Sequence, residues 1–312
     1  MSMYRKVIRI GEKSIGITLP KNWLDSIDIG LGDLVEVRAA GDMLVIKPVT
    51  TGRPEEKPTE FSVSDDIDEV SRIIIASYIE GLDSMALKGK RETIRRAYQR
   101  IEPKLPGSLI LEGESETIIK IATSEVNVDL LEILSSMSSM LNSMFERLVT
   151  YLESNGDKNI TELLEMDDQV DKLYFLALRA IKKLSFKDPK ESIDDTLVVK
   201  NMEHIADALD RTANFIRRSN FSQACLSTLS TKVKDVWSYS LKAITAYLSN
   251  SKDNALRVIT NREAMLDNIF NIIKEGHCER DIAGVIHESQ LIIALSVDIA
   301  ESTFSKYVRQ II

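Results

Sequence analysis

The sequence contains few of the residues that define several large classes of protein. It has two cysteines, Cys225 and Cys278, among 312 residues, which is too few for a disulfide framework or a cysteine-rich zinc site. No uncharged apolar run approaches the roughly 18 residues needed to span a bilayer, and the best candidate, Leu291 to Val297, has seven residues. Nothing near Met1 has the basic and then apolar pattern of a signal peptide. We therefore expect a cytoplasmic protein that is not inserted in a membrane.

Glycine and proline are also scarce, and they are unevenly distributed. Of the 13 glycines and 7 prolines, seven residues lie within 1–50, but only four lie within 127–312. Because both residues interrupt helices, the C-terminal part should be almost entirely helical. The polar, proline-bearing stretch that begins at Thr51 is typical of an interdomain linker. We expect three folded parts, at residues 1–50, 63–125 and 126–312, with a linker at residues 51–62 between the first two.

The first part has the residue pattern of short β-strands. Four apolar runs lie at 7–10, 15–19, 34–37 and 44–46, and Pro20 begins a short helix. A chain of about 50 residues forms only a marginal core, and four short strands leave exposed edges. A second copy of the chain would cover both, so we expect a homodimer or a higher oligomer.

Three motifs in this part carry a resemblance to a known family. They are Arg5-Lys6-Val7, the Gly-x-x-Ser-x-x-Ile-Thr-Leu-Pro-Lys stretch that ends at Lys21, and Gly32-Asp33-Leu34-Val35-Glu36-Val37 followed by Leu44 to Pro48. Residues 3 to 49 thereby resemble the AbrB/SpoVT/MazE swapped-hairpin domain. The resemblance implies that two chains interlace their hairpins into one small β-barrel, and that basic side chains of the first strands and loop face operator DNA.

The distribution of charge agrees with DNA binding by this part. The whole chain has a net charge of −8, yet residues 1–21 contain five basic residues and one acidic residue. Such a basic cluster suits phosphate contacts, whose affinity comes from released counterions. Arg5 and Arg9 are four residues apart, so a regular strand would place them on one face, with Lys6 on the other. The alternative is a solvated hairpin. The candidate DNA-binding residues are Arg5, Lys6, Arg9, Lys13 and Lys21.

The middle part is predicted to be a small α+β module. It contains an N-capped helix at 67–79, a second helix at 91–101, and a hairpin of strands at 109–111 and 117–121. Residues 88–104 hold seven basic and two acidic residues. This basic stretch is either a second phosphate-contacting surface, a solvated helix face, or a surface that docks on the acidic tail.

The tail has helical apolar spacing over six segments. Breaks near 155–156, 187–189, 219–220, 249–250 and 276 predict six helices of roughly 20 to 30 residues in an elongated antiparallel bundle. The first seam steps by three or four residues, through Leu134, Met137, Leu141, Met144, Leu148 and Leu152. An acidic motif recurs at an offset of 96 residues, which indicates two three-helix repeats at about 126–220 and 221–312.

The acidic motif consists of two carboxylates four residues apart. Such residues share one face of a helix, and their like charges form no internal salt bridge. Two such pairs on neighbouring antiparallel helices would gather four carboxylates. The pairs are Asp167 with Asp171, Glu203 with Asp207, and Glu263 with Asp267, while the last helix holds Asp298.

These pairs resemble the motifs of the PhoU family, regulators of phosphate uptake built from two three-helix repeats that can bind metal-ion clusters. The resemblance covers about 127–312. It implies a metal site at Asp167, Asp171, Glu203 and Asp207, and a weaker one at Glu263, Asp267 and Asp298. The second is weaker because Ala294 stands where the fourth motif would have a carboxylate.

Carboxylate-rich sites suit Mg, Mn, Fe or Zn ions. The alternative is a hydrated acidic stripe, which is what such pairs on a surface helix usually are. His204 lies about 100° around the helix from Glu203, so we expect it to be a surface or interhelix hydrogen-bonding residue and not a ligand.

The whole chain resembles a fusion known chiefly in archaea. The expected fold class is multidomain α+β: a small swapped-hairpin β-barrel head, a small α+β connector, and a mainly α tail of two three-helix repeats. The expected function is a dimeric transcription regulator of phosphate homeostasis, whose head binds DNA and whose tail senses phosphate status through metal or through the ATPase subunit of a phosphate ABC transporter.

Two other classes of function stay open at this point. One is an interaction protein that regulates a phosphate transporter and uses the head only to dimerise. The other is a metal-dependent enzyme. Against an enzyme stand the lack of a nucleophile–base arrangement, the lack of a phosphate-cradling glycine loop, and a total of only three histidines. We therefore expect no catalytic activity.

Overall fold

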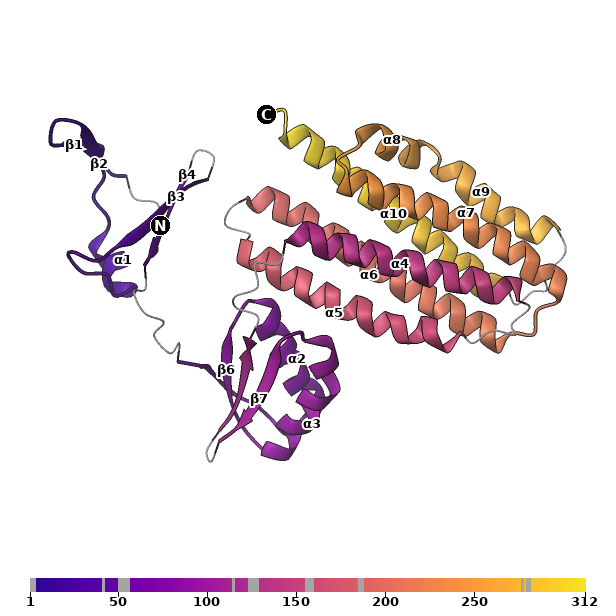
Figure 1. Cartoon of the computed structure of the whole chain (residues 1–312), viewed down its shortest axis with the longest axis horizontal. Coiled ribbons are helices and arrows are strands. Elements are labelled where there is room, and N and C mark those ends of the chain that lie inside the picture. Colours follow the sequence, from indigo (N-terminus) through magenta and orange to yellow (C-terminus); the bar gives the residue numbers. More distant parts are fainter. Residues whose placement is uncertain are drawn as a thin grey trace. The chain divides into compact units, whose positions relative to one another are not determined.

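Two compact units make up the chain, residues 1–56 and residues 57–312 (Figure 1). The computed structural model describes residues 4–40, 43–49, 57–113, 116–122, 129–154, 160–184, 188–275, 278 and 282–312. The predicted breaks at 155–156, 187 and 276 lie outside the described residues, as do residues 51–56 of the predicted linker.

The first unit, called the head here, contains two separate β-hairpins and one short helix. Strand β1 (Ile8–Ile10) pairs antiparallel with β2 (Ser14–Gly16), and Arg9 lies opposite Ile15. After helix α1 (Lys21–Ser26), β3 (Val35–Ala40) pairs antiparallel with β4 (Met43–Pro48). In the turn after β1, Gly11 has a φ of +70°, a conformation that side chains with a Cβ rarely adopt. The strands and the helix lie close to the positions predicted for them.

The head lacks a core of its own within the described residues. None of the side chains described between 4 and 49 is buried. Large apolar side chains of both hairpins are more than half exposed, among them Ile10, Ile15, Val37 and Leu44. Burial of such side chains supplies most of the free energy of folding, so this unit requires another apolar surface to cover them.

The connecting module (residues 57–122) begins the second unit with a four-stranded sheet in the order β5-β6-β8-β7. Strands β5 and β6 are parallel and joined by α2, whereas β8 is antiparallel to both β6 and β7. The side chain of Asp66 caps α2 by accepting from the Asp68 amide at 2.8 Å. The elements are β5 (Thr59–Ser62), α2 (Ile67–Ile79), β6 (Ser84–Lys88), α3 (Arg91–Ile101), η1 (Glu102–Lys104), β7 (Ser108–Glu112) and β8 (Thr117–Ile121).

Strands β5 and β6 were not expected from the sequence. The residues of β5 have the composition of a linker, because Phe61 is the only large apolar side chain among the four, and the strand therefore falls within the predicted linker. Strand β6 has the central residues Met-Ala-Leu, which have little intrinsic preference for strands. Both Met85 and Leu87 are fully buried beneath α2 and α3, beside Ile74 and Ile119. Tertiary packing, and not local propensity, therefore places β6 in the sheet.

The helical domain (residues 129–312) is a bundle of long helices (Figure 1). All six residues of the predicted first seam are buried in its core. The fifth predicted helix is broken in two at Asn261, where the Thr260 hydroxyl donates to the Leu256 carbonyl at 2.9 Å. Its helices are α4 (Leu130–Glu153), α5 (Thr161–Leu184), α6 (Pro189–Arg218), α7 (Gln223–Leu248), α8 (Lys252–Thr260), α9 (Arg262–Glu275) and α10 (Ala283–Arg309).

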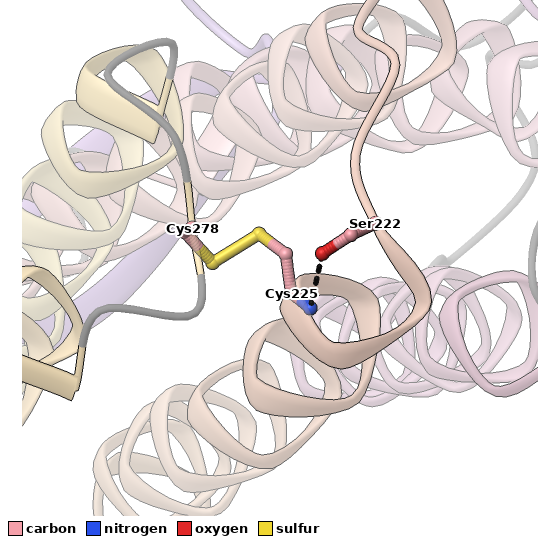
Figure 2. Close-up of a disulfide and its surroundings, with 3 residues drawn as sticks. All are labelled: Ser222, Cys225 and Cys278. Carbon is pink, nitrogen blue, oxygen red and sulfur yellow. Dashed lines mark hydrogen bonds between the residues drawn. A yellow bond between two sulfur atoms is a disulfide. The ribbon is translucent and has the colours of Figure 1, made fainter.

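A disulfide joins the two cysteines of the helical domain (Figure 2). Cys225 lies in the first turn of α7, where its amide donates to the Ser222 hydroxyl at 3.2 Å, and Cys278 lies between α9 and α10. The bond closes a sequence separation of 53 residues. The cysteine count excludes a framework of several disulfides, but it did not predict this single bond.

Helix α10 is, within the described part of the chain, the one helix long and apolar enough to cross a membrane by length and composition. In its most apolar window, 56% of the residues are buried inside the protein. The helix packs against α6, α7 and α8. Its apolar composition is therefore accounted for by its place in the core of the bundle.

Candidate functional site

The first candidate site is the basic hairpin of the head, defined by Arg5, Lys6, Arg9, Lys13 and Lys21. All five side chains are exposed. Arg9 is the one with a described hydrogen bond, which its Nη2 donates to the Glu12 carbonyl at 2.8 Å. None of the five forms an ion pair with a residue that the structure describes. The charge of the basic hairpin is therefore available to a polyanion.

The structure does not support a shared face for Arg5 and Arg9. Strand β1 begins at Ile8, so Arg5 and Lys6 lie in irregular backbone before it. Alternation of side chains applies only within a regular strand. The shared face predicted for Arg5 and Arg9 therefore does not form on β1.

The second candidate site, called the acidic cluster here, lies between α5 and α6 in the helical domain. Asp167 and Asp171 come from α5, and Glu203 and Asp207 come from α6. Burial, together with the charges of Asp207, Asp171 and Asp167, raises the pKa of Glu203 to about 7. The fold therefore brings together the four carboxylates that the i, i+4 spacing placed on two helix faces.

A fifth carboxylate, which the sequence reasoning missed, belongs to the same cluster. Burial raises the pKa of Asp167 to about 6, and Asp171, Asp207 and Asp210 add to this rise. Asp210 follows Asp207 by three residues, so it lies on the same face of α6. Helical periodicity applied beyond the four-residue motif could have found it.

Two cations of the protein itself contact this cluster. Lys104 of η1 places its Nζ 2.5 Å from Asp171 Oδ2 and 3.5 Å from Asp168 Oδ1. Burial by itself would lower the pKa of Lys104, but its bonds with Asp171 and Asp168 raise the pKa above the usual value. On α6, Arg211 bridges Asp207 at 3.3 Å and Glu288 of α10 at 3.1 Å. Part of the negative charge is thus neutralised from within the chain.

The arrangement does not fit a metal ion as the side chains stand. Among the described residues, no three His, Cys, Asp or Glu side chains converge closely enough to hold one. The donor set has the right chemistry for a hard cation, but Lys104 and Arg211 hold Asp171 and Asp207. His204 lies at the edge, with its Nε2 3.6 Å from Glu203 Oε2.

The corresponding residues of the second repeat do not form a matching cluster in the described structure. Glu263 and Asp267 of α9 are exposed, and Glu263 pairs with the neighbouring Arg262 at 3.3 Å. Burial raises the pKa of Asp298 on α10, while Arg262 acts to lower it. A cation again faces the carboxylates that the sequence assigned to a weaker metal site.

The basic stretch of the connecting module is mostly neutralised by neighbouring carboxylates. Arg95 forms two bonds with Glu112, at 2.7 and 2.8 Å, and Arg100 pairs with Asp68 at 2.7 Å. Lys88 pairs with Glu60 at 2.6 Å, and Lys104 reaches the acidic cluster. Because Lys88, Arg95 and Arg100 stay exposed in these pairs, the contacts favour the interpretation of a solvated helix face, whereas Lys104 shows docking on the acidic tail.

Comparison with known families agrees with both resemblances drawn from the motifs. Residues 8–54 match the model of the family described as antidote–toxin recognition MazE, bacterial antitoxin. Residues 134–216 match the model of the PhoU domain. No curated protein and no solved structure matches the chain. Both matched families consist of regulatory or binding domains, and the acidic cluster and basic hairpin lie largely within the matched segments.

Proposed function

We propose that the protein is a dimeric DNA-binding transcription regulator of phosphate homeostasis. The observation that supports it most directly is the combination, in one chain, of a basic hairpin that forms no ion pair with a described residue, lying largely in a MazE-like segment, with a PhoU-like helical domain. The head would bind operator DNA, and the helical domain would respond to phosphate status. The PhoU match supports a role in phosphate homeostasis, and we further propose that the head contacts DNA and recognises an operator.

Dimerisation follows from the exposed apolar surface of the head. A unit with no buried side chain among its described residues 4–49 has no core, while Val37 and Leu44 are 54% and 63% exposed on the β3–β4 hairpin. A second head offers the same apolar surface and the same unpaired strand edges, so one symmetric contact would cover both. It would also double the number of cations presented to DNA.

The direct test is the affinity of the purified full-length protein for genomic DNA fragments, measured by gel shift and footprinting over a range of salt concentrations. We expect footprints upstream of phosphate-transport genes. Arg5→Ala and Arg9→Ala should each lower the affinity for DNA. In a dimer, each should also reduce the slope of log affinity against log salt concentration by about 2, because each substitution removes a phosphate contact from both protomers.

The matched control is Arg95→Ala in the connecting module. This arginine carries the same charge, but Glu112 neutralises it through two hydrogen bonds. We expect this variant to bind DNA as the wild type does. Absence of DNA binding at low salt, with all three variants equally inert, would refute the proposal.

A second candidate function is supported by the charge of the rest of the chain. Residues 57–312 hold 32 basic and 40 acidic residues, so the second unit is acidic. In this case the protein would regulate a phosphate transporter through contact with its ATPase subunit, and the head would only dimerise. Co-purification with the ATPase, combined with weak and salt-insensitive DNA binding, would favour this function over the first.

A further inference from the structure

The polar contacts between the connecting module and helix α5 lie at two places of different character, and Phe175 of α5 packs against the core of the module between them. At one place, near the C-terminal end of α5, Arg179 is held by the end of α2 and the turn that follows it. At the other, near the middle of α5, Lys104 contacts the acidic cluster. The two contacts lie about two helical turns apart on one helix, since residues 171 and 179 are eight positions apart.

The Arg179 contact is buried and has several acceptors. Its side chain is only 4% exposed. Its Nη1 donates to the Tyr78 carbonyl at 2.7 Å and the Leu82 carbonyl at 3.0 Å, and its Nη2 pairs with Asp83. The guanidinium also lies 4.9 Å from the centre of the Tyr78 ring. Loss of one partner would leave a buried charge without compensation, so opening this contact would cost a large free energy.

The Lys104 contact is more open and depends on a single lysine. The Lys104 side chain is 34% exposed, and Asp168, the more distant of its two partners, is 61% exposed. An ion pair with this access to water is weakened by salt and contributes less than a buried one. The strength of the pair comes from Asp171, which is 16% exposed and stands among four other carboxylates of the acidic cluster.

We propose that the acidic cluster is a docking site for the connecting module, in which the Lys104 ammonium takes the place that a metal ion would have, and that this contact is a releasable latch beside the permanent anchor at Arg179. Opening the latch frees η1 from α5 while the anchor keeps the module attached. The acidic motif of the first repeat thereby acts on the module that directly follows the head in the chain.

The disagreement between the motif and the observed geometry has a simple electrostatic origin. Crowded carboxylates require a cation, protonation or solvation. A metal ion requires at least three of them to converge on one point, and this is not seen among the described residues. Lys104 and Arg211 instead meet the carboxylates separately, at Asp171 and at Asp207. The protein's own cations satisfy the charge without a metal centre.

Hydrogen exchange of the full-length protein, followed by mass spectrometry of peptides, tests this proposal. In Lys104→Gln we expect exchange to rise about ten-fold or more in peptides covering 101–108 and 167–171, with no change at 78–83 beside the anchor. Raising NaCl from about 0.05 M to about 1 M should have the same selective effect on the wild type. Lys104→Arg, which retains the charge, should resemble the wild type.

The matched control is Lys88→Gln, because Lys88 pairs with Glu60 inside the module and makes no described contact with α5. It should leave all three peptides unchanged. An Asp171→Asn variant should reproduce the effect of Lys104→Gln, and the double variant should add nothing to either single variant.

Three results would overturn the proposal. One is an identical response to Lys104→Gln and Lys88→Gln. Another is an equal rise in exchange at 78–83, which would mean one cooperative interface and no separate latch. The third is saturable binding of Mn²⁺ by the wild type, with a Kd below about 100 µM and protection of 167–171, since this would show a metal centre. None of these results depends on DNA binding by the head, so this proposal and the proposed function fail independently.

Discussion

The head and the second unit of this chain differ in how they use apolar residues. The second unit buries its large apolar side chains in two cores, one in the connecting module and one in the helical bundle. The head has strands, turns and a helix of its own, but none of its side chains described between 4 and 49 is buried. Regular secondary structure therefore does not imply an independent core, and we expect the head to obtain one from a partner.

The largest expected effect on this contrast comes from placing a charge on the apolar surface of the head. Val37→Asp should prevent the head from associating, because an aspartate would be buried at the contact without a partner. Light scattering of the full-length protein should then report a monomer in place of a dimer, with loss of DNA binding.

The matched control lies on the second unit. Ile193 of α6 is 62% exposed, so Ile193→Asp makes the same kind of substitution at a comparably exposed apolar residue. It should change the free energy of unfolding by no more than about 0.5 kcal/mol and leave the oligomeric state unchanged. A dimer that survives Val37→Asp would contradict the assignment of the head as the dimer contact.

The disulfide should stabilise the second unit without affecting the head. Loop closure across 53 residues reduces the entropy of the unfolded chain, and the stabilisation expected from this is about 4 kcal/mol. Cys225→Ser, or reduction of the wild type, should lower the melting temperature of the helical domain in calorimetry. DNA affinity of the variant at room temperature should match that of the wild type. An unchanged melting temperature after reduction would show that the bond contributes nothing.

A smaller effect concerns the pH dependence of the second unit. In the absence of added metal, Glu203 with its pKa of about 7 keeps its proton in the folded state at a pH where the unfolded chain has released it. Stability should therefore fall as the pH rises from the unfolded value of about 4.5 through about 7, by on the order of 2 kcal/mol.

Glu203→Gln should remove this part of the pH dependence, which chemical denaturation at about pH 5 and about pH 8 would measure. The control is Glu263→Gln at the corresponding motif position of the second repeat, where the side chain is 80% exposed. We expect the control to behave as the wild type does. Equal slopes for wild type and Glu203→Gln would mean that Glu203 is ionised throughout this range.

Local patterns in the sequence predicted the parts of the fold that depend on near neighbours along the chain. Helix α3 was predicted at its observed bounds, and so was strand β8, because their periodicity is strong and their ends carry turn residues. The prediction failed at β6, whose sequence has little strand preference. It also failed at Asn261, which separates α8 from α9 within a segment whose apolar spacing predicted one continuous helix.

The candidate sites show the same division. The spacing of Asp167, Asp171, Glu203 and Asp207 predicted that two helix faces would be acidic, and the fold places these faces together. The spacing contained no information about Lys104, which is 67 residues from Asp171 and belongs to the connecting module. The cation that meets an acidic face is selected by packing between elements.

By itself, the sequence determined the helical character of the tail, the basic start of the head and the two acidic helix faces. These features follow from composition and from periodicities of two and 3.6 residues, which act over one or two turns. Only the tertiary structure decided that β6 completes a sheet, that Cys225 reaches Cys278, and that Lys104 reaches Asp171. Each of these contacts joins residues far apart in the chain, so their meeting depends on how whole elements pack and not on local residue preference.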